Sequence, residues 1–206
     1  MKKIKVLIAD DHAVVRTGLA AILGTEPDIE VVGLAKNGAE AVETAIATHA
    51  DVVIMDIRMP VMDGAEATAA LHEKQPGAKV LVLTSFGEAD GVALALESGA
   101  AGAITKTAED AELVTVIRNI ADGGKYISPE IEKLLTESPP IPKLTPRQHE
   151  ILAYMTKGLT NVEIAEILRI RKDTVEEHVN LLLAKLDAAN RTEAVAIALR
   201  KQLIKT

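Results

Sequence analysis

Short apolar runs alternate with segments of helical periodicity over residues 4–121 of the chain. The apolar runs predict strands at residues 4–9, 29–35, 51–55, 80–83 and 101–105. Segments with helical spacing follow them, at about residues 14–23, 39–47, 64–74, 89–98 and 109–121. The runs are continuous rather than alternating, which is typical of strands buried on both faces of a sheet. We therefore predict an α/β fold with a doubly wound, five-stranded parallel sheet.

The pattern changes after Gly124. Residues 125–143 contain prolines at positions 129, 139, 140 and 142, and leave room for one short helix near 130–135. From Leu144 the periodicity is helical throughout, with breaks near residues 158–160, 169–172 and 187–190. The sequence thus predicts a first domain over residues 1–124, a linker over 125–143 that is partly helix and partly stiff Pro-rich segment, and a small all-α, four-helix domain over 144–206.

Polar residues stand where four of the predicted strands end. Asp10 and Asp11 follow the first strand, Asp56 the third, Thr84 the fourth and Lys106 the fifth. In sheets of this type ligands bind beyond the carboxyl ends of the strands, so we expect these side chains to meet. Three carboxylates, a hydroxyl and an ammonium are the groups needed to hold Mg²⁺ and a phosphorylated aspartate. The central aspartate is the predicted phosphoryl acceptor, with the hydroxyl and the ammonium on phosphoryl oxygens.

We expect Mg²⁺ as the cofactor, because this ion takes one or two carboxylates and retains several waters. Asp11 and Asp56 are the predicted direct ligands, and Asp10 would act directly or through a water. The backbone carbonyl of Arg58 could supply another oxygen. His12, next to the aspartate pair, is interpreted as a helix-start residue rather than a ligand.

Composition narrows the class of protein. Hydrophobic residues make up 48% of the 206-residue chain and aromatic residues only 1%, so the cores must be built from Ala, Val, Ile and Leu. The absence of cysteine excludes disulfides and thiolate metal sites. No apolar run is long enough to cross a membrane, and a strand that starts at residue 4 leaves no room for a signal peptide. We expect a cytoplasmic protein of bacterial type that does not bind membranes.

The formal net charge of −7 is unevenly distributed. Residues 1–143 carry 13 basic and 22 acidic side chains, whereas residues 144–206 carry 10 basic and 8 acidic ones. The first part therefore has a net charge of −9 and the second a net charge of +2. This asymmetry indicates two modules with different partners.

Residues 1–125 resemble the receiver domain of bacterial response regulators, which has a flavodoxin-like fold. The matching stretches are IADDHAVVRTGLAAIL, VVIMDIRMPVMDG, VLVLTS and GAITKT. The resemblance implies that Asp56 accepts a phosphoryl group from a sensor histidine kinase. It also implies that Asp10 and Asp11 hold Mg²⁺, and that Thr84 and Lys106 transmit the change.

One position departs from the receiver pattern. Receivers commonly carry an aromatic residue three positions before the lysine, and this chain has Ala103 there. The nearest aromatic residue is Phe86, two positions after Thr84. We therefore expect switching to rely on Thr84 and on the loop and helix that follow it.

Residues 144–204 resemble the LuxR-type helix-turn-helix of the NarL/FixJ class of response regulators. The matching stretches are LTPRQHEILAYMTKGLTNVEIAEILRI, TVEEHVNLLLAKL and NRTEAVAIAL. The resemblance implies DNA binding, with the helix over about residues 172–186 in the major groove. The candidate DNA-binding residues are Asn161, Arg171, Lys172, Thr174, Glu176, Glu177, Asn180, Lys185 and Arg191.

The side chains of that helix favour DNA binding less clearly than the helix-turn-helix motif does. Its core stripe follows helical spacing and consists of Val175, Val179, Leu182, Leu183 and Leu186. The opposite face carries Asp173, Glu177, Leu181 and Ala184. Glu176 stands where the family usually has lysine, and the adjacent Glu176 and Glu177 would repel phosphate. A glutamate can, however, accept a hydrogen bond from the amino group of cytosine.

Three functions remain open at this point. The first is a transcription regulator, not itself an enzyme, that is phosphorylated by a sensor histidine kinase, forms a homodimer on phosphorylation and binds promoter DNA. The second is a response regulator whose second domain binds proteins, for which the exposed Leu181 and Ala184 would suit. The third is a Mg²⁺-dependent phosphoaspartyl phosphohydrolase. It is disfavoured because no further acid–base residues follow Asp56 and because it leaves the second domain unexplained.

Overall fold

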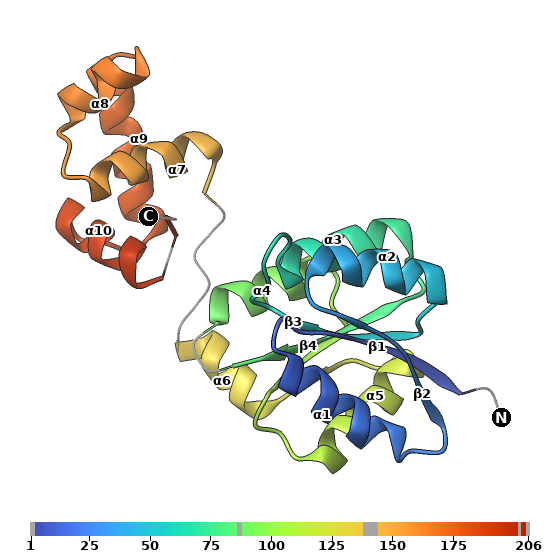
Figure 1. The fold of residues 1–206 in the computed structure, drawn as a ribbon. Helices are drawn as coiled ribbons and strands as arrows, with labels where there is room; N and C mark the ends of the chain where they lie inside the picture. Colours follow the sequence, from blue (N-terminus) through green and yellow to red (C-terminus); the bar gives the residue numbers. More distant parts are fainter. Residues whose placement is uncertain (1–2, 86–87, 138–143, 202, 205–206) are drawn as a thin grey trace. The chain divides into compact units, whose positions relative to one another are not determined.

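The chain forms two compact units, Met1–Pro140 and Ile141–Thr206, in a computed structural model (Figure 1). The structure describes residues 3–85, 88–137, 144–201 and 203–204. Within these ranges, no helix is long and apolar enough to cross a membrane.

The first unit is built on a parallel sheet with the strand order β2-β1-β3-β4-β5-β6. Each neighbouring pair in this order is parallel. The order has the arrangement of the flavodoxin-like doubly wound folds, with one strand added at the edge. The strands are β1 (Ile4–Ala9), β2 (Ile29–Ala35), β3 (Val52–Asp56), β4 (Lys79–Thr84), β5 (Gly102–Thr105) and β6 (Tyr126–Ile127).

The prediction of five strands is wrong by one, because β6 lies in the segment interpreted as a linker. This strand pairs Tyr126 with Gly102 and Ile127 with Ala103. Two residues are too few to produce a recognisable run of apolar positions, so the pattern could not reveal the strand. It lies at the edge of the sheet beside β5.

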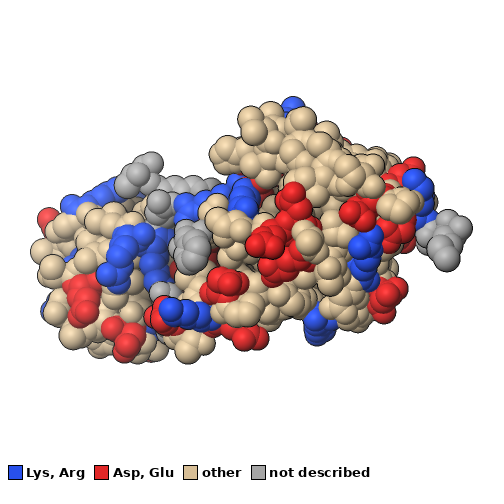
Figure 2. Space-filling model, turned by 90° about the horizontal axis from the view of Figure 1, so that it is seen from below, with Lys and Arg blue, Asp and Glu red and all other residues tan. Residues whose placement is uncertain are grey.

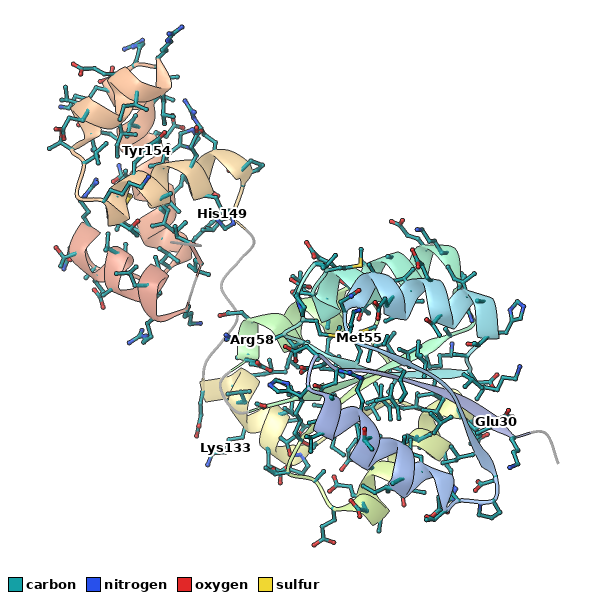
Figure 3. All side chains as sticks on the ribbon, in the orientation of Figure 1. Glu30, Met55, Arg58, Lys133, His149 and Tyr154 are labelled. Carbon is teal, nitrogen blue, oxygen red and sulfur yellow. The ribbon has the colours of Figure 1, made fainter. Side chains whose placement is uncertain are left out.

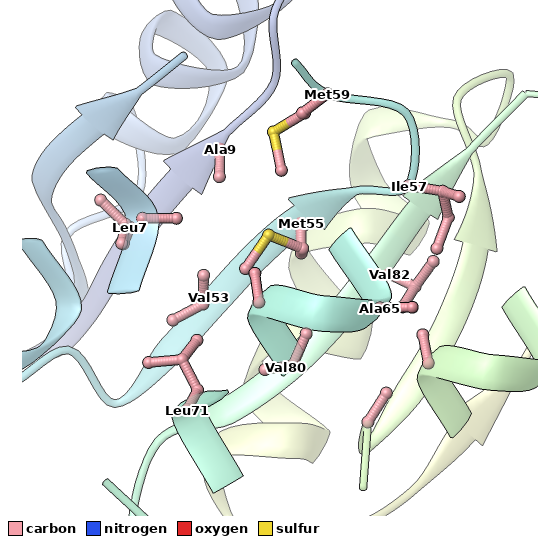
Figure 4. Close-up of a cluster of buried hydrophobic side chains, with 14 of the residues drawn as sticks. Leu7, Ala9, Val53, Met55, Ile57, Met59, Ala65, Leu71, Val80 and Val82 are labelled. Atoms are coloured by element: carbon pink, nitrogen blue, oxygen red, sulfur yellow. The ribbon is translucent and has the colours of Figure 1, made fainter. Parts of the chain in front are cut away.

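Helices cover both faces of this sheet (Figure 1). They are α1 (Ala13–Gly24), α2 (Gly38–Thr48), α3 (Gly64–Lys74), α4 (Ala89–Glu97), α5 (Asp110–Ala121) and α6 (Pro129–Glu137). One buried cluster places Leu7, Val53 and Met55 against Ala65 and Leu71 of α3 (Figure 4). Figure 3 likewise shows Met55 in the interior and Glu30 and Lys133 on the outside.

The alternate residues of the same strands face a second cluster. Ile8, Ile54 and Leu81 pack there with Leu23 of α1 and Ile117 of α5. Because successive strand residues point to opposite faces, both faces of the sheet are buried, as the continuous apolar runs predict.

Residues 126–137, which lie in the segment predicted as a partly helical linker, belong to the first unit. Ser128 is fully buried, and its carbonyl oxygen accepts hydrogen bonds from the amides of Ile131 and Glu132 at the start of α6. Ile131 is 1% exposed and lies in the same buried cluster as Leu7 and Val53. Helix α6 packs against β5 and α4. The rest of the predicted linker, residues 138–143, lies outside the described residues.

In the second unit the structure describes α7 (Pro146–Thr156), α8 (Asn161–Leu168), α9 (Lys172–Lys185) and α10 (Arg191–Arg200). Capping boxes begin two of them, with Thr145 and Thr160 accepting hydrogen bonds from the amides of Gln148 and Glu163. Such caps satisfy amides that have no partner inside the helix. All four helices contribute to one apolar core, whose fully buried members include Ile151, Leu152, Ile164, Val175, Leu182, Ala194 and Ala198.

Candidate functional site

The ends of four strands bring the predicted polar residues to one edge of the sheet. Asp56 is the last residue of β3 and Thr84 the last of β4, while Asp10 follows β1 and Lys106 follows β5. The register aligns these ends, since Asp56 is level with Leu83 and Thr84 with Thr105. Doubly wound sheets bind their ligands at this edge.

Lys106 joins the two buried carboxylates of this site. Its Nζ lies 2.7 Å from Oδ2 of Asp10 and 2.9 Å from Oδ2 of Asp56. Both aspartates are almost fully buried, at 1% and 3% exposed. The other oxygen of Asp56 accepts a hydrogen bond from the amide of Ile57 at 2.9 Å. One ammonium therefore offsets two carboxylates that have little access to water.

The electrostatics of the site follow from this burial. Burial raises the pKa of Asp56 to about 6, against the opposing hydrogen bond from Lys106, and the charges of Asp10 and Glu88 push it in the same direction. Burial lowers the pKa of Lys106, but its hydrogen bonds to the two aspartates outweigh burial and raise that pKa overall. Lys106 is therefore a fixed positive charge at neutral pH, directed at the carboxylate of Asp56.

The residues of this edge fit a hard divalent cation. Asp10, Asp11, His12 and Asp56 each offer a ligand atom, and these atoms lie within 4.8 Å of one another. Three carboxylates at this spacing are the oxygen-rich donors that Mg²⁺ prefers. His12 is the N-cap residue of α1, and its Nδ1 lies 2.7 Å from Oδ1 of Asp11. The proposed carbonyl ligand of Arg58 remains a prediction.

Thr84 has a partner that the sequence did not reveal. Its hydroxyl donates to Oε2 of Glu88, and the carbonyl oxygen of Ser85 is a second acceptor at 3.1 Å. The other oxygen of Glu88 lies 2.8 Å from Nε of Arg58. Sequence reasoning missed Glu88 because it looked only at strand ends. The available signal was an acidic residue four positions after a strand-end threonine, at the start of the next helix.

Position 103, where receivers commonly carry an aromatic residue, is fully buried in this structure. Ala103 lies in β5, is fully buried and packs in the cluster that covers the sheet face beneath α2, α3 and α4. Phe86, the nearest aromatic residue, lies outside the described residues.

Helix α9 has the two faces that its sequence predicts. Val175, Val179 and Leu182 are buried in the core of the second unit, with Leu186 beside them and Leu183 partly buried. The opposite face is exposed, and it consists of Asp173, Glu177, Leu181 and Ala184.

The cations predicted to contact DNA have acceptors within their own unit. Arg171 lies 2.5 Å from Asp173, and Lys172 lies 2.9 Å from Glu176, one helical turn along α9. Lys185 donates to the side chain of Gln148 at 3.0 Å. These contacts place local negative or polar groups beside each positive charge.

Two further candidates bind each other. Arg191 donates to the side-chain oxygen of Asn161 at 2.9 Å and also to the carbonyl oxygen of Leu159. Burial lowers the pKa of Arg191, which nevertheless stays protonated. This contact joins the starts of α8 and α10. Among the remaining candidates, Thr174 and Glu176 are half-buried, and Glu177 and Asn180 are exposed. Figure 2 shows acidic and basic side chains interspersed over the face in view.

Two families match the two units. The family described as "Response regulator receiver domain" matches residues 6–118, which include every residue of the strand-end site. The family described as "Bacterial regulatory proteins, luxR family" matches residues 142–198. The chain belongs to the response regulators. It joins a receiver domain to a LuxR-type DNA-binding domain, the architecture that the two resemblances imply.

Relatives match this response regulator over nearly their whole length. It is 40% identical over 209 residues to "Transcriptional regulatory protein LiaR" of Bacillus subtilis, covering 98% of this chain and 99% of that protein. It is 38% identical over 206 residues to "Response regulator protein VraR" of Staphylococcus aureus, with 98% and 99% covered. A solved structure, that of the response regulator ChrA of a heme-sensing two-component system, matches with a TM-score of 0.61 and 35% identity. That match covers 99% of this chain and 100% of the solved chain.

Proposed function

We propose that Asp56 of this response regulator accepts a phosphoryl group from a phosphohistidine of a sensor histidine kinase. The observation that carries the proposal is the buried Asp56 carboxylate, fixed by Lys106 at 2.9 Å beside two further aspartates at the sheet edge. A carboxylate oxygen of Asp56 forms a bond to phosphorus while the phosphorus–nitrogen bond of the phosphohistidine breaks. The imidazole leaves with the bonding electron pair and takes up a proton.

The neighbouring residues hold the product of this transfer. Lys106 pairs with a phosphoryl oxygen, and the hydroxyl of Thr84 donates to another. Asp10, Asp11, Asp56 and the carbonyl of Arg58 would hold Mg²⁺. When bound, this ion withdraws charge from the phosphoryl oxygens. The chain is the acceptor in this reaction and has no separate substrate to turn over.

The output of the switch is DNA binding by the second unit. The added phosphoryl carries about −1.5 to −2 charge at neutral pH, which draws Thr84 and Lys106 toward it and shifts the loops that follow β4 and β5. We propose that this shift promotes a homodimer that binds promoter DNA through α9. The contacts would come from the candidate residues Asn161, Arg171, Lys172, Thr174, Glu176, Glu177, Asn180, Lys185 and Arg191.

Phosphoryl uptake tests the input side directly. The wild type, incubated with Mg²⁺ and acetyl phosphate, is expected to gain one phosphoryl group by mass spectrometry. Asp56→Asn is expected to gain none, because an amide is a far weaker nucleophile than a carboxylate. Asp122→Asn, at an exposed position after α5, is the matched control and should behave like the wild type. Uptake by Asp56→Asn at the wild-type rate would refute the assignment of Asp56.

One observation favours a second candidate for the output. The exposed face of α9 presents Glu177 beside Leu181, which is 47% exposed, and the nearby cations are already engaged by acidic or amide side chains. An acidic and apolar face fits a protein better than it fits phosphate. This candidate predicts that the phosphorylated chain binds promoter fragments no better than random duplex, even at low salt.

A further inference from the structure

Glu88 is a nearly buried carboxylate that the transfer reaction does not use. It occupies the N-cap position of α4, yet it makes no hydrogen bond to the first amides of that helix. Its side chain is only 10% exposed. One oxygen accepts from the hydroxyl of Thr84 and from the amide of Ser85, the latter at 3.3 Å. The other lies 2.8 Å from Nε of Arg58.

These contacts join the two loops that flank the phosphoryl acceptor. Arg58 lies two residues after Asp56, on the loop that leaves β3, while Thr84 and Glu88 lie on either side of the loop between β4 and α4. The carboxylate is thus turned back toward the sheet edge instead of capping its own helix.

We propose that Glu88 is a positioning residue that competes with the phosphoryl group for the hydroxyl of Thr84. The proposal rests on the phosphoryl acceptor role given above for Asp56. In the unphosphorylated chain the hydroxyl of Thr84 donates its hydrogen bond to Glu88. In the phosphorylated chain it donates to a phosphoryl oxygen instead. A stronger hydrogen bond between Thr84 and Glu88 therefore makes the change of acceptor cost more free energy, and a weaker one makes it cost less.

The competition follows from the chemistry of a hydroxyl. Thr84 has one O–H donor, so a full hydrogen bond to Glu88 excludes a full hydrogen bond to a phosphoryl oxygen. A bond to a carboxylate is about twice as strong as a bond between neutral groups, so giving it up has a measurable cost.

The release would reach α4 at once, because Glu88 immediately precedes Ala89, the first residue of that helix. Ala89 is 5% exposed and so is fixed against the interior of the unit. A displacement of Glu88 would therefore be passed directly to the buried first turn of α4. Glu88 and Thr84 would thus couple the acceptor site to α4, a role for which receivers commonly use an aromatic residue at the position of Ala103.

Affinity for a phosphoryl analogue tests the proposal on the full chain. Beryllium trifluoride is titrated in the presence of Mg²⁺, and the dissociation constant is obtained from amide chemical shifts. Glu88→Gln is expected to tighten binding about fivefold, because a neutral amide holds the Thr84 hydroxyl more weakly than a carboxylate does. Glu97→Gln, an exposed position on the last turn of α4, removes the same charge and should leave the affinity unchanged.

The same substitution in two Thr84 backgrounds separates competition from simple charge repulsion. In Thr84→Ala the Glu88→Gln change is expected to have an effect below twofold, whereas in Thr84→Ser, which keeps the hydroxyl, the full effect should return. An equal effect in both backgrounds would mean that Glu88 acts through its charge alone and would overturn the proposal. Unchanged or weaker binding by Glu88→Gln would overturn it as well.

The acceptor role is checked separately in the same titration. If Asp56→Asn bound beryllium trifluoride as tightly as the wild type, the function proposed for Asp56 would fail. If binding depends on Asp56 but does not respond to Glu88, only the inference about Glu88 fails.

Discussion

At the scale of single residues, the site is defined by charges that have little access to water. Asp10 and Asp56 share one ammonium, and the pKa of Asp56 is nevertheless raised to about 6, chiefly by burial. A carboxyl group whose folded-state pKa lies above its unfolded value stabilises the fold at low pH and loses that contribution as the pH rises. Asp56, the proposed phosphoryl acceptor, therefore lowers the stability of the fold at neutral pH.

The first prediction concerns that instability. Asp56→Asn should be more stable than the wild type at pH 7.5 by about 1–3 kcal/mol, because the amide removes an ionised carboxylate that burial disfavours. This difference in unfolding free energy should shrink as the pH falls from about 6 toward 4, the window between the folded-state and unfolded-state pKa values of Asp56. Urea denaturation followed by circular dichroism, without Mg²⁺, measures the difference. A constant difference across this range would mean that Asp56 does not titrate abnormally.

At the scale of secondary-structure elements, α6 is the most consequential addition to the receiver. It lies beyond residues 6–118, the range that the receiver family matches, yet it contributes to the core of the first unit. It packs against β5 and α4 and covers part of the sheet face beside α4, while β6 pairs with the edge of β5. Strand edges and apolar faces of this kind need covering to prevent association.

Removing the buried side chain of α6 tests whether the helix is integral to the unit. Ile131→Ala is expected to cost about 2–5 kcal/mol of unfolding free energy, because the side chain is 1% exposed and leaves a cavity. Ile46→Ala on α2 is the matched control, since that side chain is 38% exposed and its loss should cost much less. Equal costs at the two positions would show that α6 does not stabilise the first unit. Urea denaturation serves as the measurement.

Helix α9 carries the prediction about DNA. Glu176→Lys should raise the affinity of the phosphorylated chain for promoter fragments, by gel shift at low salt, because it replaces a repelled charge with a phosphate contact. It also removes the acidic partner of Lys172, which lies 2.9 Å away. Glu150→Lys on α7, an exposed position, is the control for charge alone. An increase of the same size at both positions would show that only net charge matters.

The elements also show what the sequence could and could not predict. Strands such as β3 and β4 are predicted to within one residue, because four consecutive buried apolar positions produce a strong pattern. The two residues of β6 produce none, and α6 was expected only as a short helix in a linker. The burial of α6 depends on the elements that the fold places beside it, β5 and α4, and no local pattern encodes those neighbours. Glu88 escapes prediction for the same reason, because its contacts to Thr84 and Arg58 arise only in the folded chain.

At the scale of the whole molecule, the charge difference between the units separates two kinds of association. The part of the chain before residue 144 carries a net charge of −9, and the remainder carries +2. Two copies that meet through their first units repel each other, and phosphorylation adds to that repulsion. DNA binding, in contrast, depends on attraction between cations and phosphate.

The two associations should therefore respond to salt in opposite directions. Between 50 and 500 mM NaCl, the dimer fraction of the phosphorylated chain, measured by light scattering, should rise because screening weakens the repulsion. Its affinity for DNA should fall over the same range. A dimer that dissociates as salt rises would indicate an interface between groups of opposite charge instead.

Because α6 is packed into the first unit, only the short segment after it connects the two units. The length of that segment limits how far apart the second units of a dimer can bind. The helix ends at Glu137 and the second unit is described from Leu144, so the connection can span at most about 25 Å. DNA half-sites for dimeric helix-turn-helix proteins lie about 34 Å apart. Two such connections starting from one dimer cover that distance, so binding of one second unit would raise the effective concentration of its twin at the neighbouring half-site. Avidity of this kind could compensate for a weak contact by each α9.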